Sequence, residues 1–173
     1  MSELLWQLRK MDDITSMELI KAMIHLQGTM SNLLREFMDK HPDFPEREKV
    51  EIITTGKVEN LELDGKLGLT FAGYREQKED VFFAPLAAAY CYGLVGIAQR
   101  NRIHWDFAGK TLNIILNNEE KYRKKYPQYL EMWVLLAYMI DFEAWKEGFV
   151  LDDTWQGGSS FTLKAYQSGV KYH

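Results

Sequence analysis

Several features that carry chemistry in other proteins are scarce in this chain of 173 residues. Cys91 is its one cysteine, which excludes an internal disulfide and a cysteine-based zinc site. Acidic residues number 25 and basic residues 21, so the net charge is -4. A mildly acidic chain lacks the positive field that drives non-specific binding to nucleic acid. We therefore expect a cytoplasmic, reduced protein that does not bind nucleic acid.

Motifs for common catalytic and cofactor sites are absent as well. The sequence contains no phosphate-binding loop, no dinucleotide-binding fingerprint, no serine nucleophile elbow and neither of the histidine–glutamate metal motifs. Cys91 lies within an apolar stretch, where little would stabilise a thiolate, so it is predicted to be a small core residue. We expect no metal site, no cofactor and no enzymatic centre.

One uncharged segment requires a test for a membrane span. Residues 81–98 form 18 residues without a charge, the lower limit for a spanning helix. Pro85 suits the first turn of a helix, so the helix is predicted to begin near Ala84. The part that follows would extend about 22 Å, short of a hydrocarbon core of roughly 30 Å. A buried central helix is therefore expected, and no membrane span.

The spacing of apolar residues predicts a mainly α-helical, single-domain bundle of five or six helices. The clearest helix begins at Thr15 or Ser16, with Glu18 in its first turn, and ends at His41-Pro42. Two predicted helices are apolar nearly all round and should lie at the centre of the bundle. The other predicted segments are short or amphipathic. In chain order the predicted helices are 15–41, 45–55, 84–101, 105–117 and 127–147, and 2–10 and 119–126 are predicted as short helical segments.

One segment favours β structure. Leu61 and Leu63 alternate with polar residues before Asp64-Gly65, and Leu67 and Leu69 alternate after it. Asp-Gly between such runs is typical of a two-residue hairpin turn, in which both turn positions have a positive φ. The sequence therefore predicts a small β-hairpin at about residues 58–71, inserted in the helical domain.

The character of the sequence changes near residue 153. Residues 1–153 are predicted to form the helical domain, and residues 154–173 a C-terminal tail or arm. The tail begins with a Gly- and Ser-rich stretch, and residues 161–166 then alternate between apolar and polar types. This pattern predicts a strand or an extended arm. We expect the arm to dock on the protein itself, on a sister subunit or on a partner.

Arg100, Arg102 and His104 follow the central apolar helix and offer one candidate for catalysis. Helical ribonucleases of the HEPN type use an arginine and a histidine at the end of a helix, with a longer spacing than the three residues that separate Arg100 from His104 here. Each residue turns a helix by about 100°, so the shorter spacing changes the direction of the histidine. A cationic helix end is the simpler interpretation. A HEPN-like ribonuclease with Arg100 and His104 as catalytic residues is a minor alternative.

The distribution of charge suggests a binding surface. Residues 36–51 carry six acids and three bases, residues 141–153 carry five acids and one base, and basic residues gather in 100–125. The main hypothesis is a non-enzymatic protein-binding protein, such as an inhibitor, immunity factor or adaptor, that acts through acidic and aromatic surface patches. Its expected partners are another protein and its own copies. The alternative is a structural subunit of a larger oligomeric or viral assembly that uses its C-terminal arm. The predicted partner-binding residues are Glu46, Glu48, Glu51, Glu147, Asp152, Asp153, Trp155, Phe161 and Tyr166.

Overall fold

The computed structural model describes residues 3–11, 14–74 and 79–146. Within these ranges it contains eight α-helices and no β-strand, which confirms the mainly α prediction but exceeds the expected five or six helices. The predicted C-terminal arm lies outside the described residues. The helices are α1 (Glu3–Lys10), α2 (Ser16–Lys40), α3 (Arg47–Thr55), α4 (Lys66–Gly73), α5 (Asp80–Gln99), α6 (Arg102–Asn117), α7 (Glu119–Lys125) and α8 (Pro127–Lys146).

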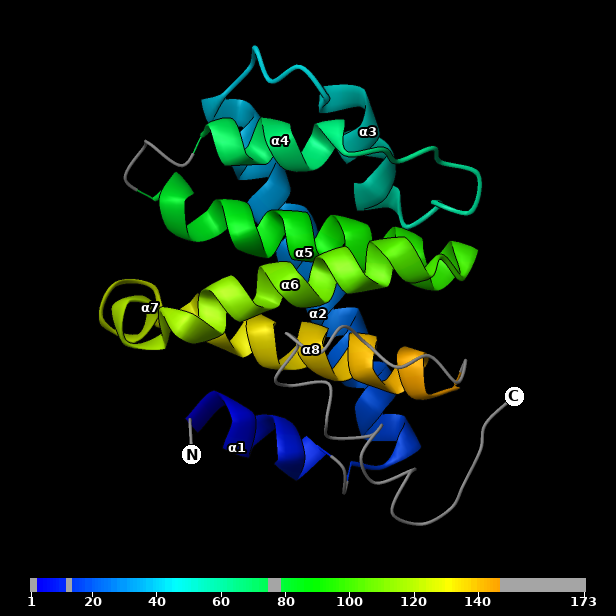
Figure 1. The fold of residues 1–173 in the computed structure, drawn as a ribbon, viewed down its shortest axis with the longest axis vertical. Helices are drawn as coiled ribbons and strands as arrows, with labels where there is room; N and C mark the ends of the chain where they lie inside the picture. The colour runs from blue at the N-terminus through cyan, green and yellow to red at the C-terminus, as the bar shows by residue number, and fades with distance from the viewer. Residues whose placement is uncertain (1–2, 12–13, 75–78, 147–173) are drawn as a thin grey trace.

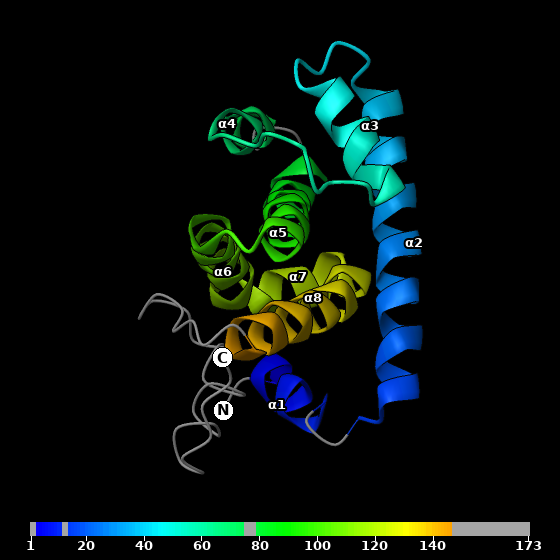
Figure 2. The same cartoon turned by 90° about the vertical axis from the view of Figure 1, so that its right-hand side faces the viewer.

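The helices pack around α5, which contacts α2, α3, α4, α6 and α8. In Figure 1, α4, α5, α6 and α8 run side by side across the molecule, and α2 crosses behind them. Figure 2 shows α2 along one side of the molecule, with α3 packed against its C-terminal half. The two helices predicted to be central, α5 and α8, therefore form much of the core, in which Trp105 and Trp133 are fully buried.

The start of α5 differs from the prediction. The helix begins at Asp80, not near Ala84, and Pro85 lies inside it. Its 20 residues extend about 30 Å, so the helix is not shorter than a hydrocarbon core, contrary to the prediction. Within the described residues α5 is the one helix long and apolar enough to cross a bilayer, yet 72% of its most apolar window is buried in the fold. Burial in a protein core accounts for this composition.

A hydrogen bond between two distant side chains explains why α5 begins early. The His41 Nε2 atom, at the end of α2, lies 2.9 Å from the Asp80 Oδ2 atom, and both side chains are largely buried. Next to this pair, the Lys40 ammonium contacts the Glu79 carboxylate. Asp80 sits at the positive end of α5, where a carboxylate is favoured, and His41 is the residue that ends α2. These contacts hold an additional turn of α5 in place.

The predicted β-hairpin is wrong, because the segment after the Asp-Gly pair forms α4. Gly65 has a helical φ of -73° and not the positive φ of the predicted turn. The Asp64 carboxylate accepts a hydrogen bond at 2.9 Å from the backbone N–H two residues later, which favours the start of a helix. Leu67 and Phe71, four residues apart, are fully buried, whereas Leu69 between them is 75% exposed. Burial thus follows the helical period and not the two-residue period of a strand.

Side chains of α5 hold α4 and the segment before it. The Tyr92 hydroxyl donates to the Asp64 carbonyl and accepts a hydrogen bond from the Gly68 N–H at 3.0 Å. The Gln99 amide donates to the carbonyls of Val58 and Leu61. The residues predicted as strands therefore satisfy backbone groups through α5, and no second strand is needed.

Candidate functional site

An apolar groove lies on the face formed by α4, α5 and α6. Figure 2 views these helices nearly end-on, with α4 and α6 on the same side of α5. Helix α5 forms the floor of the groove, the other two helices form its walls, and the volume is about 530 Å³. The residues that line it are Gly65, Gly68, Leu69, Phe71, Ala72, Ala84, Pro85, Ala88, Phe107, Lys110, Thr111 and Ile114.

Small residues on α5 create the floor of the groove. Ala84 and Ala88 line this hollow. The tight contacts are made elsewhere: a Cβ atom at Gly93 would lie 3.0 Å from Ile140 Cδ1, and one at Gly96 would lie 2.9 Å from Trp105 Cδ1. The small residues of α5 therefore allow close approach of α8 and α6 and leave space between α4 and α6.

The walls of the groove expose large apolar side chains. Leu69 on α4 is 75% exposed, and Phe107 and Ile114 on α6 are each 37% exposed. Ile103, one turn before Phe107, is 76% exposed and extends the same helix face beyond the groove. Large apolar side chains that gather in one exposed region are typical of a binding surface.

Lys110 adds a positive charge to the otherwise uncharged lining of the groove. It is the one charged residue among those that line the groove in the described part of the chain. It lies on α6 between Phe107 and Ile114, three residues after the first and four before the second, so it shares their face. The Thr111 hydroxyl already donates to the Phe107 carbonyl at 2.8 Å. The groove thus offers an apolar surface with one cation, which suits an apolar ligand that carries an anionic group.

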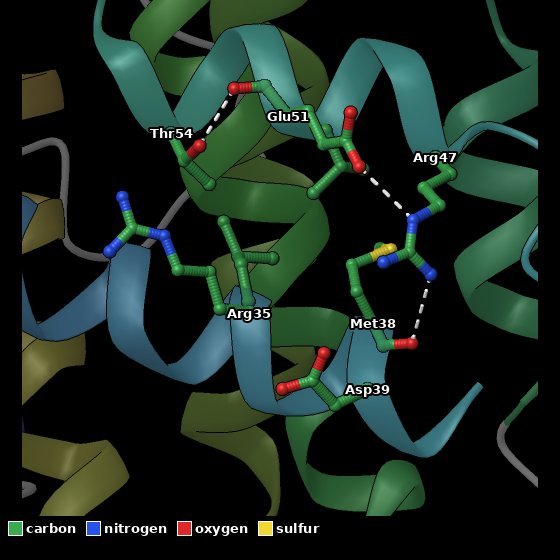
Figure 3. A pocket seen from close by; sticks show the side chains of 8 residues that line it. Arg35, Met38, Asp39, Arg47, Glu51 and Thr54 are labelled. Carbon is green, nitrogen blue, oxygen red and sulfur yellow. Dashed lines mark hydrogen bonds and ion pairs between the residues drawn. The ribbon is translucent and has the colours of Figure 1, made fainter. Parts of the chain in front are cut away.

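A second, smaller pocket lies between α2 and α3 and has a volume of about 200 Å³. Figure 3 shows Arg47 reaching from α3 towards α2, with the Arg35 guanidinium at the other end of the pocket. The Arg47 guanidinium donates to Glu51 at 3.0 Å and to the Met38 carbonyl at 3.3 Å. The bond to Met38 joins α3 to α2, and the bond to Glu51 lies within α3, so the pocket is explained by helix packing.

Two of the three predicted partner-binding acids near α3 form ion pairs within the protein. Glu46 lies 3.3 Å from the Lys49 ammonium, and Glu51 pairs with Arg47 as described above. Glu48 is exposed to solvent. Glu48 and Glu51 lie on α3, and Glu46 is the residue that precedes this helix. The other predicted partner-binding residues lie outside the described residues: Glu147, Asp152, Asp153, Trp155, Phe161 and Tyr166.

The candidate catalytic residues lie on two different elements. Arg100 ends α5 in the left-handed conformation, with a φ of 53°, and His104 lies in the first turn of α6. His104 is 9% exposed, its ring lies 5.5 Å from the ring of Tyr92, and burial lowers its pKa. The pattern of the helical ribonucleases places both residues at the end of one helix, and this arrangement differs from it.

Neither the groove nor the His41–Asp80 hydrogen bond was predicted from the sequence. The hydrogen bond joins residues 39 positions apart, and Phe37 and Tyr74 pack against the His41 ring at 4.7 and 4.4 Å between ring centroids. Nothing in the local sequence indicates such a contact. A signal for the groove was available, because Ile103, Phe107 and Ile114 recur at helical spacing on α6. That signal shows an apolar face but not whether another helix covers it.

Comparison with known proteins adds no assignment. No protein-family model matches the sequence, and no curated protein or solved structure is significantly similar to it. In the described ranges, no three His, Cys, Asp or Glu side chains gather in an arrangement that could hold a metal ion. The function is therefore argued from the geometry of the groove.

Proposed function

We propose that this is a non-enzymatic binding protein, which holds an apolar-faced helix of a partner protein in the α4–α5–α6 groove. The observation that carries the proposal is the groove itself, with its apolar lining and the exposed Leu69, Phe107 and Ile114 on its walls. Recognition of an amphipathic helix by an apolar groove between helices is a common mode of protein binding. An inhibitor, an immunity factor and an adaptor all work by binding of this kind.

The dimensions of the apolar surface favour a helix over a small molecule. From Ile103 to Ile114 the exposed stripe of α6 covers about three turns, or roughly 16 Å. Ile103 lies beyond the groove, where a small molecule held within it would not cover the side chain. A bound helix of similar length would cover the whole stripe. Lys110 would then face an acidic residue on the polar flank of that helix.

A synthetic peptide with this chemistry tests the proposal. The probe is a fluorescent amphipathic helix with leucines on one face and glutamates on its flank, and binding is followed by fluorescence anisotropy. Ala72→Trp fills the groove from an exposed position on α4, and it should weaken binding by about tenfold or more. Gly73→Trp is the matched control, because Gly73 is exposed on the same helix but does not line the groove.

The outcomes separate the classes of ligand. Binding that Ala72→Trp weakens and Gly73→Trp preserves supports the proposal. A peptide that fails to bind, or that binds both tryptophan variants equally, overturns it. If dodecanoate binds in the groove and the peptide does not, the groove is a site for small amphiphiles and the protein-binding proposal fails.

Each of the two alternative functions can be tested by a separate experiment. A structural subunit that uses residues 154–173 would form a ring or filament, which the mass in solution would reveal. A HEPN-like ribonuclease would cleave RNA and would lose that activity on His104→Ala. No observation on the described residues favours either alternative over the groove.

A further inference from the structure

We infer that the α4–α5–α6 groove takes one phenylalanine side chain as the central anchor of the partner helix. This inference deepens the proposed function and rests on it, because it names the residue by which the partner would be recognised. It is carried by the position of the hollow part of the groove, the ring that bounds the hollow, the hydrogen bonds of the polar groups there, and the charge at the rim.

The hollow lies near the middle of a longer apolar surface. Helices α5 and α6 run side by side, and α6 begins at the edge of the molecule where α5 ends (Figure 1). Ile103 in the first turn of α6 and Val81 in the first turn of α5 therefore lie at opposite ends of this surface, and they are 76% and 38% exposed. Val81 precedes the lining residue Pro85 by four positions, so the two share a helix face. The residues that dominate binding usually lie at the centre of an interface, so the middle of the partner helix supplies the anchor.

Small side chains leave room in the hollow for a large one. Ala84 and Ala88 lie one turn apart on α5 at its base, and Ala72 lines it from α4. Phe107 closes one end, because a Cβ atom at Gly68 would lie only 3.0 Å from Phe107 Cζ, so α4 and α6 meet there. The groove volume of about 530 Å³ accommodates a side chain of aromatic size.

The ring of Phe107 favours an aromatic anchor over an aliphatic one. Its centroid lies 4.3 Å from that of the Tyr92 ring, and Gly68 contacts it from α4, so packing on two sides holds the ring in place. The ring is nevertheless 37% exposed. Aromatic rings attract one another in edge-to-face and offset arrangements, in addition to the apolar area that they bury. A ring beside Phe107 therefore gains a contact that a leucine side chain does not make.

The polar groups around the hollow disfavour tyrosine and tryptophan as the anchor. The Thr111 hydroxyl donates to the Phe107 carbonyl at 2.8 Å, and the Gly68 N–H donates to the Tyr92 hydroxyl at 3.0 Å. Pro85 has no N–H. These groups are satisfied without a ligand, so a hydroxyl or an indole N–H buried beside them would lose its bond to water without gaining a partner. Phenylalanine has an aromatic ring and no such group.

Charge complementarity identifies the flank of the bound helix. Lys110 is exposed at the rim, and no acidic residue lines the groove within the ranges that the structure describes. An acidic side chain beside the phenylalanine, on the side of the partner that faces α6, would meet this ammonium group. The partner is therefore an amphipathic helix with a phenylalanine in the middle of its apolar face and an acid on its flank.

Four peptides test the inference with the full chain. They are the fluorescent probe described above with leucine, phenylalanine, tyrosine or alanine at its central apolar position, and circular dichroism checks that their helicities match. The phenylalanine peptide should bind about threefold or more tightly than the leucine peptide, and about tenfold or more tightly than the alanine peptide. It should also bind about tenfold more tightly than the tyrosine peptide. Because phenylalanine and tyrosine have similar helix propensities, this last comparison isolates the hydroxyl group.

The peptide series separates failure of the inference from failure of the proposed function. A phenylalanine peptide that binds no more tightly than the leucine peptide, or than the tyrosine peptide, overturns the inference, while binding of the leucine peptide leaves the proposed function standing. If none of the four peptides binds, the proposed function fails and the inference fails with it.

Two variants of the protein locate the anchor. Ala88→Leu fills the hollow from α5 and Ala72→Leu fills it from an exposed position on α4, so each should remove most of the preference for phenylalanine over alanine. Ala98→Leu is the matched control, because Ala98 is exposed on α5 and does not line the groove. Thermal unfolding checks that each variant is folded, and Ala72→Leu keeps the test valid if Ala88→Leu is not. A preference for phenylalanine that both variants retain in full would place the anchor elsewhere and overturn the inference.

Discussion

Gly96 shows how one absent side chain sets the distance between α5 and α6. A Cβ atom there would lie 2.9 Å from Trp105 Cδ1 and 3.2 Å from the Trp105 backbone nitrogen. Trp105 is fully buried, so its ring has little room to move. Close packing of these two helices therefore depends on the glycine.

We expect Gly96→Ala to lower the free energy of unfolding by about 1–2 kcal/mol, because strain from overpacking exceeds the gain in helix propensity. Gly73→Ala is the control, since no atom lies within 4 Å of its added Cβ, and it should be neutral or stabilising. Urea denaturation of the two variants measures both effects. A stabilising Gly96→Ala would show that α6 can shift to accommodate the methyl group.

His104 makes stability depend on pH. Burial lowers its pKa below the ordinary value of 6.5, so the folded state binds the proton more weakly than the unfolded chain does. Between the lowered pKa and 6.5 the unfolded chain therefore holds more protons, and stability falls as the pH falls through this range. His104→Asn should lose less stability than the wild type between pH 7 and pH 5 in urea denaturation at each pH. An unchanged pH dependence would mean that another group is responsible.

At the scale of the element, α2 shows a helix start that was predicted and is confirmed. The Thr15 hydroxyl accepts a hydrogen bond from the Glu18 N–H at 3.2 Å, and the Glu18 carboxylate accepts one from the Thr15 N–H at 3.2 Å. This reciprocal pair is a capping box. It satisfies two backbone donors at the exposed end of the longest helix.

Loss of the N-cap of α2 should lower the stability of the protein measurably. Thr15→Ala should lower the free energy of unfolding by about 1 kcal/mol, because the Glu18 N–H loses its acceptor in the protein. Ser16→Ala changes the neighbouring exposed residue within the helix and should alter stability by less than about 0.5 kcal/mol. Thermal unfolding followed by circular dichroism compares the two. Equal effects of both variants would mean that the cap contributes little.

At the scale of the whole molecule, buried tyrosines and the one cysteine determine how the fold responds to alkali. Tyr90 and Cys91 lie in the central helix α5, and burial raises the pKa of both. Burial also raises the pKa of Tyr129, on α8, to about 12. The folded state therefore keeps protons that the unfolded chain releases near pH 10.

Stability should fall steadily as the pH rises from 10 towards 12, because the unfolded chain binds fewer protons than the folded chain in this range. Tyr129→Phe removes one of the contributing groups, so it should reduce the slope of stability against pH. The check is the melting temperature of the wild type and the variant at several alkaline pH values, with absorbance at the tyrosinate band to follow ionisation. An unchanged slope would assign the effect to the remaining groups.

Much of the helical architecture was predictable, because it depends on local chemistry. Capping by Thr15, the stop at Pro42 and the nearly continuous apolar character of α8 act within a few residues, and each led to a helix in the expected place. The hairpin was wrong because leucines at positions 61, 63, 67 and 69 fit both a strand and a helix. Burial of Phe71 against Phe37 and Phe44 decided between them, and that contact joins distant parts of the chain.

The sequence by itself determined the helical class, the starts and ends of the strongest helices and the central position of α5 and α8. The tertiary structure alone decided that α4 is a helix, that His41 and Asp80 meet, and which apolar faces stay uncovered. The physical reason is the range of the interactions. Caps and periodicity act over one or two turns. Burial depends on which helix packs on which face, and the local sequence of a helix does not show which other helices will pack against it.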